Sequence, residues 1–510
     1  PETRDLYNNY GLKNDQSLSK TKILETQDQV IYTDRIFNIN QISEENISYA
    51  ADIMKALQKK SGKATYIMPI PERAVFESGY ETEKGKYSDF IEKLEASFSD
   101  PSVVLNPLSE LEKHQDEYIY FRTENSWTMR GAFYGAQVVF FLCYIYLYRL
   151  LYRNVSRLLV NNACMLLCVG FIMLTRLSMA KGLDKALRQF AIVVISAALA
   201  WLVPYIMERV WQLYKLQWVY AGAGLLILLV VWAAGNESFG AQLSLTIAGV
   251  SIQPSEFVKL TFVFFVASMF YQSTDFKTIF LTTAVAGAHV LVLVLSKDLG
   301  SALIFFVTYL LMLFVATGSW VYLITGSALG TGAALAAYQL FDHVRRRVAA
   351  WSNPWADIEN KGYQITQSLF AIGTGGWFGM GLCQGMPGKI PVVEKDFIFS
   401  AVSEEMGAIF AICVLLICLG CFIQFMMIAA RMQAVFYKLI AFGLGVEYIV
   451  QVFLTVGGVT KFIPSTGVTL PFVSYGGSSI LGTFLLFGII QGLYILKRND
   501  EEETGEEVMP

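Results

Sequence analysis

From residue 131 onward the chain is a succession of long apolar runs separated by short polar connections. A helix needs about 20 mostly apolar residues to cross a hydrocarbon core about 30 Å thick, since each residue rises about 1.5 Å. Charged residues make up only 16% of the chain, against about a quarter in soluble domains. The sequence therefore predicts a mostly α-helical, polytopic membrane protein with about eleven spans. These spans fall near 131–151, 157–176, 187–208, 216–234, 255–272, 278–296, 301–317, 320–340, 399–427, 434–457 and 478–496.

Residues 1–130 differ from the rest because they are polar and contain no run long enough to cross a bilayer. Apolar residues at helical spacing in Ile47–Gln58 and a short apolar stretch at Ala64–Pro69 predict a small α/β piece. The sequence begins at Pro1, without Met and without a signal-like apolar stretch. We therefore expect the true N-terminus to lie upstream of Pro1.

Four connections hold nearly all of the polar and glycine-rich features of the membrane region. They lie around 235–254, 297–300, 341–398 and 458–477, and an even number of spans separates each from the next. All four should therefore open on one side of the membrane. Basic residues such as Arg149 and Lys438 fall on the other side, which favours that side as cytoplasmic and the four connections as extracytoplasmic. Basic residues on the side of the connections, among them Arg176, Lys185 and Arg345–Arg347, are explained by an anionic ligand. Residues 498–510 then form an acidic cytoplasmic tail.

Ionisable residues at the ends of two predicted spans are the sharpest candidates for a site. Asp298 lies at the junction of two apolar runs, where a carboxylate is costly and by default marks function. The structural alternative is that Asp298 caps the helix that starts at Ser301. Glu256 suits the first turn of the helix after Pro254, and Lys259 lies three residues further on, where the two side chains can form a buried pair.

Five motifs follow one another in the membrane region: QPSE at 253–256, DLG at 298–300, GYQITQSLFAIGTGGWFGMG at 362–381, DFIF…SEEMG at 396–407 and PSTGVTLPFVSYGGSS at 464–479. In this order they resemble the SEDS family of FtsW, RodA and SpoVE. The resemblance covers about 157–497 and implies the family's ten-helix core, so the span at 131–151 is additional.

The resemblance implies a glycosyltransferase that polymerises lipid II into glycan strands at the outer face of the bacterial cytoplasmic membrane, in division, elongation or sporulation. The expected partners are lipid II, the bilayer and a class B penicillin-binding transpeptidase, and no nucleic acid. Asp298 matches the family's essential acid, which would deprotonate the acceptor hydroxyl or hold a divalent cation (Mg or Mn) that activates it. The expected substrate-binding residues are Glu256, Lys259, Lys297, Arg347, Gln364, Gln367, Ser368, Lys389, Asp396, Thr466, Ser474, Gly476, Gly477 and Ser478.

The chain departs from the family pattern at two places. Gly240–Ser244 replaces an Arg-Trp pair that many members carry before QPSE, and Ser296-Lys297 replaces the acid and proline that commonly precede DLG. Two other functions therefore stay open: a transporter that flips lipid-linked precursors, and a non-catalytic scaffold for a class B penicillin-binding protein. Against transport, His289 is the only clear ionisable group that the sequence places deep in a span.

The segment 120–132 resembles part of a DHHW protein, an extracytoplasmic relative of the SGNH hydrolases. Glu124, Asn125 and Ser126 stand where that family has its Asp-His pair and second His. Without a general base, hydrolase or transferase chemistry is not expected. Residues 1–130 are thus interpreted as an inactive extracytoplasmic fragment of a DHHW-like domain.

Overall fold

The computed structural model describes residues 23–25, 31–33, 81–98, 104, 129–178, 184–210, 212–238, 241–247, 250–358, 360 and 362–504. The chain divides into two compact units, 1–138 and 139–510. Of the first unit the structure describes an antiparallel pair of strands, β1 (Ile23–Glu25) and β2 (Ile31–Thr33), and the helix α3 (Glu81–Ala96). The helix predicted at 47–58, the strand predicted at 64–69 and most of the DHHW-like segment lie outside the described residues.

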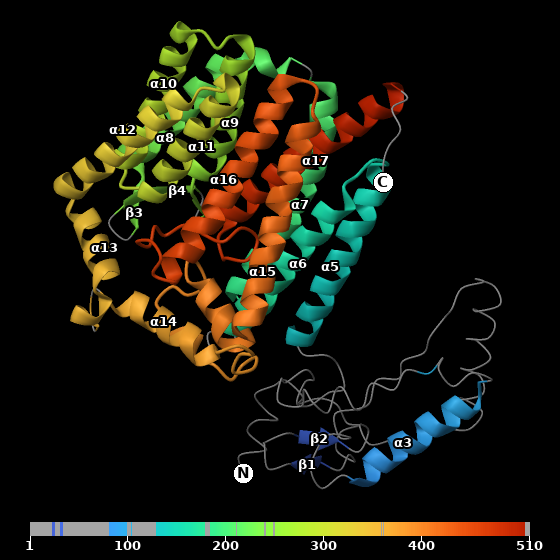
Figure 1. Ribbon diagram of the computed structural model, residues 1–510. Coiled ribbons are helices and arrows are strands. Elements are labelled where there is room, and N and C mark those ends of the chain that lie inside the picture. The colour runs from blue at the N-terminus through green and yellow to red at the C-terminus, as the bar shows by residue number, and fades with distance from the viewer. Residues whose placement is uncertain are drawn as a thin grey trace. The chain divides into compact units, whose positions relative to one another are not determined.

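The second unit is helical (Figure 1). A helix is present at each of the eleven predicted spans, beginning with α5, which crosses the boundary between the two units. The span helices are α5 (Met129–Leu151), α6 (Arg157–Ser178), α7 (Asp184–Arg209), α8 (Gln217–Ala234), α9 (Ser255–Gln272), α10 (Phe276–Leu295), α11 (Leu299–Thr317), α12 (Trp320–Leu340), α15 (Ile398–Arg431), α16 (Val435–Val459) and α17 (Gly477–Thr504).

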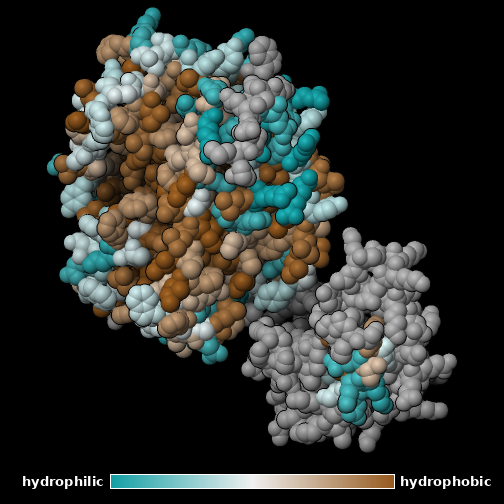
Figure 2. Space-filling model, turned by 45° about the vertical axis from the view of Figure 1, so that its right-hand side comes forward, coloured by the Kyte–Doolittle hydropathy of each residue, from teal (hydrophilic) through white to brown (hydrophobic). Residues whose placement is uncertain are grey.

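Ten of these helices are long and apolar enough to cross a membrane, judged by length and composition over the described residues. The eleventh, α9, carries the charged residues Glu256 and Lys259 in its first turns and is not among these ten. Most of its side chains are buried by neighbouring helices, among them α8, α11 and α16. In Figure 2 hydrophobic side chains cover a broad part of the flank of the second unit, as expected for a surface in contact with lipid.

The connections contain secondary structure, of which the sequence predicts only a helix at 363–372, from the helical spacing of its residues. Between α8 and α9 a three-stranded antiparallel sheet is formed by β3 (Asn236–Ser238), β4 (Ala241–Ile247) and β5 (Val250–Ile252), with Leu245 opposite Ile252. Between α12 and α15 lie α13 (Asp342–Ser352) and α14 (Tyr363–Gly375). Short 3-10 turns among the described residues are η6 (Leu213–Leu216), η7 (Pro354–Asp357) and η8 (Pro387–Lys389).

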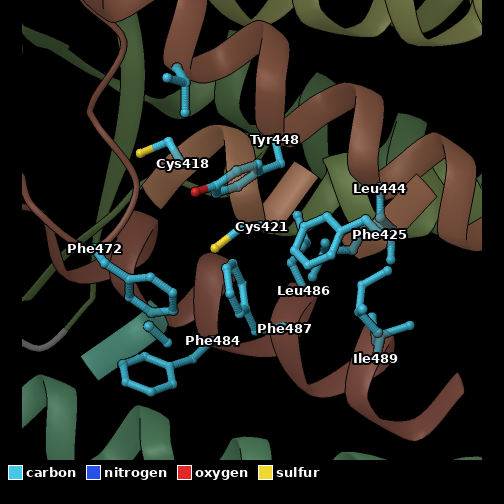
Figure 3. Packing of buried hydrophobic residues seen from close by; sticks show 14 of the residues in the cluster. Cys418, Cys421, Phe425, Leu444, Tyr448, Phe472, Phe484, Leu486, Phe487 and Ile489 are labelled. Carbon is cyan, nitrogen blue, oxygen red and sulfur yellow. The ribbon is translucent and has the colours of Figure 1, made fainter. Parts of the chain in front are cut away.

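The core of the second unit is aromatic where α15, α16 and α17 meet (Figure 3). The Phe425 ring centroid lies 5.4 Å from that of Tyr448 on α16 and 5.1 Å from that of Phe487 on α17. Phe472, from the connection between α16 and α17, reaches into the same cluster, with its ring centroid 4.8 Å from that of Phe487. Aromatic pairs at such distances stabilise beyond their buried area. Phe472 therefore anchors the hydroxyl-rich connection 460–476 to the helices.

Candidate functional site

Asp298 belongs to the tight junction between α10 and α11. The backbone N–H of Lys297 donates to the carbonyl of Val294 (3.0 Å) and that of Asp298 to the carbonyl of Leu293 (2.9 Å), the bonding pattern of a Schellman helix end. Asp298 is at the same time the N-cap of α11, because its side chain accepts a hydrogen bond from the N–H of Ser301 (3.1 Å). The capping alternative considered from the sequence is therefore confirmed, with α11 starting at Leu299.

The remaining contacts of the Asp298 carboxylate come from hydroxyl groups. Oδ2 accepts a hydrogen bond from Ser301 Oγ at 2.8 Å, and Ser255 Oγ lies 3.5 Å away at the start of α9. Burial raises the pKa of Asp298 above its usual value, an effect that the hydrogen bonds from Ser301 partly offset. The negative charge of Glu256 raises the pKa further, and Lys259 lowers it. Asp298 is still partly exposed, so a ligand can reach a carboxylate that is more basic than usual.

The predicted pair of Glu256 and Lys259 is present and buried. Lys259 Nζ lies 2.8 Å from Glu256 Oε2 and donates to Gln451 Oε1 of α16 at 2.7 Å. The amide of Gln451 in turn donates to the carbonyl of Thr469 (3.0 Å). The ammonium group of Lys259 thus links α9 to α16 and, through Gln451, to the connection 460–476.

That connection packs directly on the start of α11. A Cβ added at Gly300 would lie 2.5 Å from Val468 Cγ2 and 3.1 Å from the carbonyl oxygen of Thr466, so the last residue of the DLG motif allows a close approach that a side chain would prevent. Arg347, on α13, donates to the same Thr466 carbonyl at 3.3 Å.

Asp396 adds an acid to this group of connections. Burial raises its pKa to about 6, while the positive charges of Lys395 and Arg347 act in the opposite direction. Arg347 is therefore close enough to Asp396 to influence its ionisation. The sequence predicts that these connections lie on one side, because an even number of spans separates each from the next. The structure brings the following predicted site residues into one region at that end of the helices: Asp298, Glu256, Lys259, Arg347 and Thr466.

The other predicted binding residues differ in how open they are. Lys297 and Lys389 are exposed, while Gln364 donates to the carbonyl of Pro391 (3.0 Å). Ser368 is buried and bonded to Ser400 and to the carbonyl of Val459, so its hydroxyl is not open to a ligand here. Gln367 is partly buried on α14.

Ser474 and its neighbours hold the connection 460–476 in place. Ser474 is buried, accepts from the N–H of Leu470 (2.8 Å) and donates to the carbonyl of Lys395. The N–H of Gly476 donates to Gln189 on α7 (3.3 Å), and Ser478 accepts from the N–H of Gln253 (2.8 Å). Gly477 is the first residue of α17.

Glu447, in the middle of α16, was missed. It is 2% exposed, and neither carboxylate oxygen has a hydrogen-bond partner among the described residues. Together with Glu256, Lys259 and Gln451 it lines a small cavity of about 10 Å³. The statement that His289 is the only clear ionisable group deep in a span was therefore wrong. The signal was an acid inside an apolar run.

The described residues offer few ligands for a metal ion at this site. In the part of the chain that the structure describes, no three His, Cys, Asp or Glu side chains come close enough together to hold a metal ion. Mg²⁺ is commonly bound by one or two carboxylates together with the phosphates of a substrate. Asp298 is the carboxylate that would serve here, and its donor set alone does not make a complete metal site.

Residues 157–499 match the family described as cell cycle proteins, FtsW/RodA/SpoVE. The chain belongs to this family. It is 35% identical over 304 residues to the peptidoglycan glycosyltransferase RodA of Mycobacterium tuberculosis, covering 55% of this chain and 64% of that protein. Over 361 residues it is 31% identical to RodA of Mycobacterium leprae, covering 65% and 76%. Stage V sporulation protein E of Bacillus subtilis is 32% identical over 273 residues, covering 52% and 75%.

Solved structures share the fold. A chain from a structure titled "Structural coordination of polymerization and crosslinking by a peptidoglycan synthase complex" matches with a TM-score of 0.57 at 24% identity, covering 68% of this chain and 98% of that one. The rod shape determining protein RodA of Thermus thermophilus matches with a TM-score of 0.51 at 23% identity, covering 68% and 97%. Both matches leave about a third of this chain uncovered, so the family core accounts for only part of it.

Proposed function

We propose that this member of the FtsW/RodA/SpoVE family is a peptidoglycan glycosyltransferase that polymerises lipid II. The observation that carries the proposal is the environment of Asp298, a partly exposed carboxylate with a raised pKa at the loop end of α11. The names of the relatives in mycobacteria support it. Since the chain spans 64% of the length of the first of these relatives, its activity is a proposal about the family core.

Asp298 acts as the general base. Its carboxylate takes the proton of the acceptor sugar hydroxyl, whose oxygen forms a bond to the anomeric carbon of the growing chain. The bond from that carbon to the polyprenyl pyrophosphate breaks, and the pyrophosphate leaves with the electron pair. The two hydrogen bonds from Ser301 fix the direction of the carboxylate, and burial makes it more basic.

Two cations would stabilise the departing pyrophosphate: the exposed Lys297 and the partly buried Arg347. Lys297 is next to Asp298 and exposed, and Arg347 lies beside the connection 460–476. Arginine in particular can hold phosphate oxygens through two hydrogen bonds. Lys259 has a different role, because its ammonium group is already committed to Glu256 and Gln451. It supports the site from within the helices, where it also lowers the pKa of Asp298.

In this proposal the four connections face the outside of the cytoplasmic membrane, and residues 1–130 lie on the same side. Basic residues at the opposite ends of the helices, such as Arg149 and Lys438, support this orientation. Basic residues also lie on the side of the four connections, and in this proposal they are explained by the anionic substrate. The partner would be a class B penicillin-binding transpeptidase. The similar chain in a peptidoglycan synthase complex supports a partner of this kind.

Transport of lipid-linked precursors is the second candidate, because the structure removes one argument against it. Glu256, Lys259 and Glu447 are buried around one cavity between α9 and α16. Buried ionisable groups of this kind are common along transport pathways.

One experiment separates the candidates. The purified chain would be reconstituted into liposomes with fluorescent lipid II, and both glycan products and movement of lipid II between leaflets would be measured. We expect glycan polymers of graded length to form without any added energy source such as a nucleotide or an ion gradient. Movement without polymer would contradict the glycosyltransferase and support transport. Absence of both activities, even with the partner transpeptidase present, would leave the scaffold as the correct function.

A further inference from the structure

The segment between α14 and η8 presents apolar side chains to the surroundings. Trp377 is 67% exposed and Phe378 85% exposed, and Met380, Leu382 and Met386 are exposed beside them. No charged residue occurs from Gly362 to Gly388. A soluble loop would not collect so many exposed aromatic and aliphatic groups without a single charge.

Backbone hydrogen bonds fix the height of this segment along α15. The N–H of Ile409 donates to the carbonyl of Trp377 (3.2 Å), and the N–H of Ala408 donates to that of Gly376 (2.9 Å). Both bonds are made where α15 is kinked at Gly407, whose φ is 84°. A Cβ at Gly407 would lie 2.3 Å from the backbone nitrogen of Gly379, so the kink and the segment require each other. In Figure 1 the segment is the orange loop at the lower end of α15.

The exposure pattern of α15 gives the position of the hydrocarbon core. Before Gly407 most side chains of the helix are buried, whereas Ile409 and Ile412 begin an exposed apolar stripe that continues to Met427. From Ile409 to Met427 the helix rises about 27 Å, close to the roughly 30 Å of a bilayer core. Ile409, and with it Trp377, therefore lies at the boundary between hydrocarbon and head groups.

We propose that Trp377 and Phe378 insert into the bilayer at this boundary and tether the long connection between α12 and α15 to the membrane. The binding partner is the lipid itself. Tryptophan is enriched at this depth because its ring is apolar and its N–H stays hydrated. The tether does not depend on the proposed catalytic activity, since it follows from exposure and height alone.

The tether has a consequence for the site. α14 packs on α15 and precedes the inserted segment directly. The connection also carries Arg347 and Asp396, so the membrane surface would limit how far these two side chains move from Asp298. This consequence, unlike the tether itself, rests on the proposed function: for a polyprenyl-linked substrate, the tether would hold the binding groups near the level of its pyrophosphate.

Photo-cross-linking tests the proposal directly. p-Benzoylphenylalanine would replace Phe378 in the full chain, reconstituted alone into nanodiscs of phosphatidylethanolamine and phosphatidylglycerol. Ile412, exposed on the stripe of α15, is the lipid-facing control position, and Lys395, exposed on the connection, is the water-facing control. Each variant would first be shown to elute as a single species, and lipid adducts would be counted by mass spectrometry.

We expect the yield of lipid adducts at position 378 to be similar to that at 412 and at least about tenfold above that at 395. A yield at 378 equal to that at 395 would overturn the proposal, since the segment would then face water. Adducts between two protein chains in place of lipid would also overturn it, because the occupant would then be a second copy. A replacement of Trp377 by the same residue provides an independent second position with the same expected results.

Discussion

At the scale of single residues, Lys297 has a backbone conformation that is unusual for its type. Its φ is 62°, in the left-handed region that glycine adopts most easily. A lysine there costs about 1–2 kcal/mol relative to the right-handed conformation, yet it stands next to Asp298 with an exposed ammonium group. The turn alone would favour glycine, so the exposed ammonium group beside Asp298 explains better why a lysine stands at position 297.

Replacing Lys297 with glycine separates these two roles. Lys297→Gly should not lower the melting temperature, because the turn is relieved of strain while the unfolded chain gains entropy. The rate of polymerisation should fall about tenfold, as expected when one charge-assisted contact to a phosphate is lost. Lys461→Gly is the matched control, because Lys461 has the same φ of 62° and lies outside the proposed binding residues. An unchanged rate in Lys297→Gly would remove Lys297 from the site.

Asp396 gives a prediction about pH. Burial raises the pKa of Asp396 from 3.8 to about 6. At a pH between these two values the Asp396 carboxyl is therefore mainly protonated in the folded protein and mainly ionised in the unfolded chain. Its contribution to stability is present below pH 4 and is lost as the pH rises to about 6. The loss is at most about 3 kcal/mol, and less for a side chain that keeps some contact with water.

The variant Asp396→Asn should therefore melt at a higher temperature than wild type above pH 6 and at the same temperature below pH 4. Thermal unfolding in detergent across this range would measure the difference. A constant difference at all pH values would show that the pKa of Asp396 is the same in the folded and unfolded states. Asp275→Asn serves as a reference, since Asp275 is exposed and its pKa is lowered by hydrogen bonds from Ser273 and Thr278.

At the scale of helices, α16 carries the buried acid Glu447, which has no hydrogen-bond partner among the residues that the structure describes. An unbonded polar group in such a position costs roughly 1–3 kcal/mol. We expect Glu447→Leu to raise the free energy of unfolding, because leucine has a similar volume and no group to desolvate. The matched comparison is Gln451→Leu on the same helix, which should destabilise because it removes the acceptor of Lys259. A less stable Glu447→Leu variant would show that the carboxylate has a partner, for instance a water in the cavity.

The elements also show which parts of the fold could be predicted. The spans were correct because long apolar runs have one solution in a bilayer. The capping role of Asp298 and the pair of Glu256 and Lys259 were correct because both depend on residues three positions apart. Gln451 could not be predicted as the partner of Lys259, since nothing local relates α9 to α16.

Two misses have a physical reason in the sequence. The strand β4 alternates apolar and polar residues at Leu243–Ile247, the period of a strand, but it is short and was read as a loop between spans. Helix α13 was missed because its three arginines suggested a ligand-binding loop instead of a helix. The proposed site around Asp298 is predicted from motif order, whereas the burial of Ser368 and Ser474 could be known only from packing.

At the scale of the whole membrane unit, the connections at one end of the helices form a single structure. The connection 460–476 contacts α11 at Gly300, α13 through Arg347 and α7 through Gln189. Asp298 lies within this structure, and its neighbours come from several different segments of the chain. We therefore expect the proposed catalysis by Asp298 to depend on all of these segments. Replacing the Asp298 carboxylate alone should leave the structure of the connections intact.

The most direct test is the rate of lipid II polymerisation by Asp298→Asn beside wild type and Asp275→Asn. Asp298 caps α11 with its side chain, and asparagine caps a helix as well as aspartate does. Asp275 stands at the N-cap position of α10 without a side-chain cap hydrogen bond, so it serves as a control at the opposite end of that helix. We expect Asp298→Asn to lose at least about 100-fold in rate, the usual contribution of a general base. The rate of Asp275→Asn should be close to that of wild type, and both variants should melt normally. A normal rate in a folded Asp298→Asn protein would contradict the assignment of Asp298 as the general base.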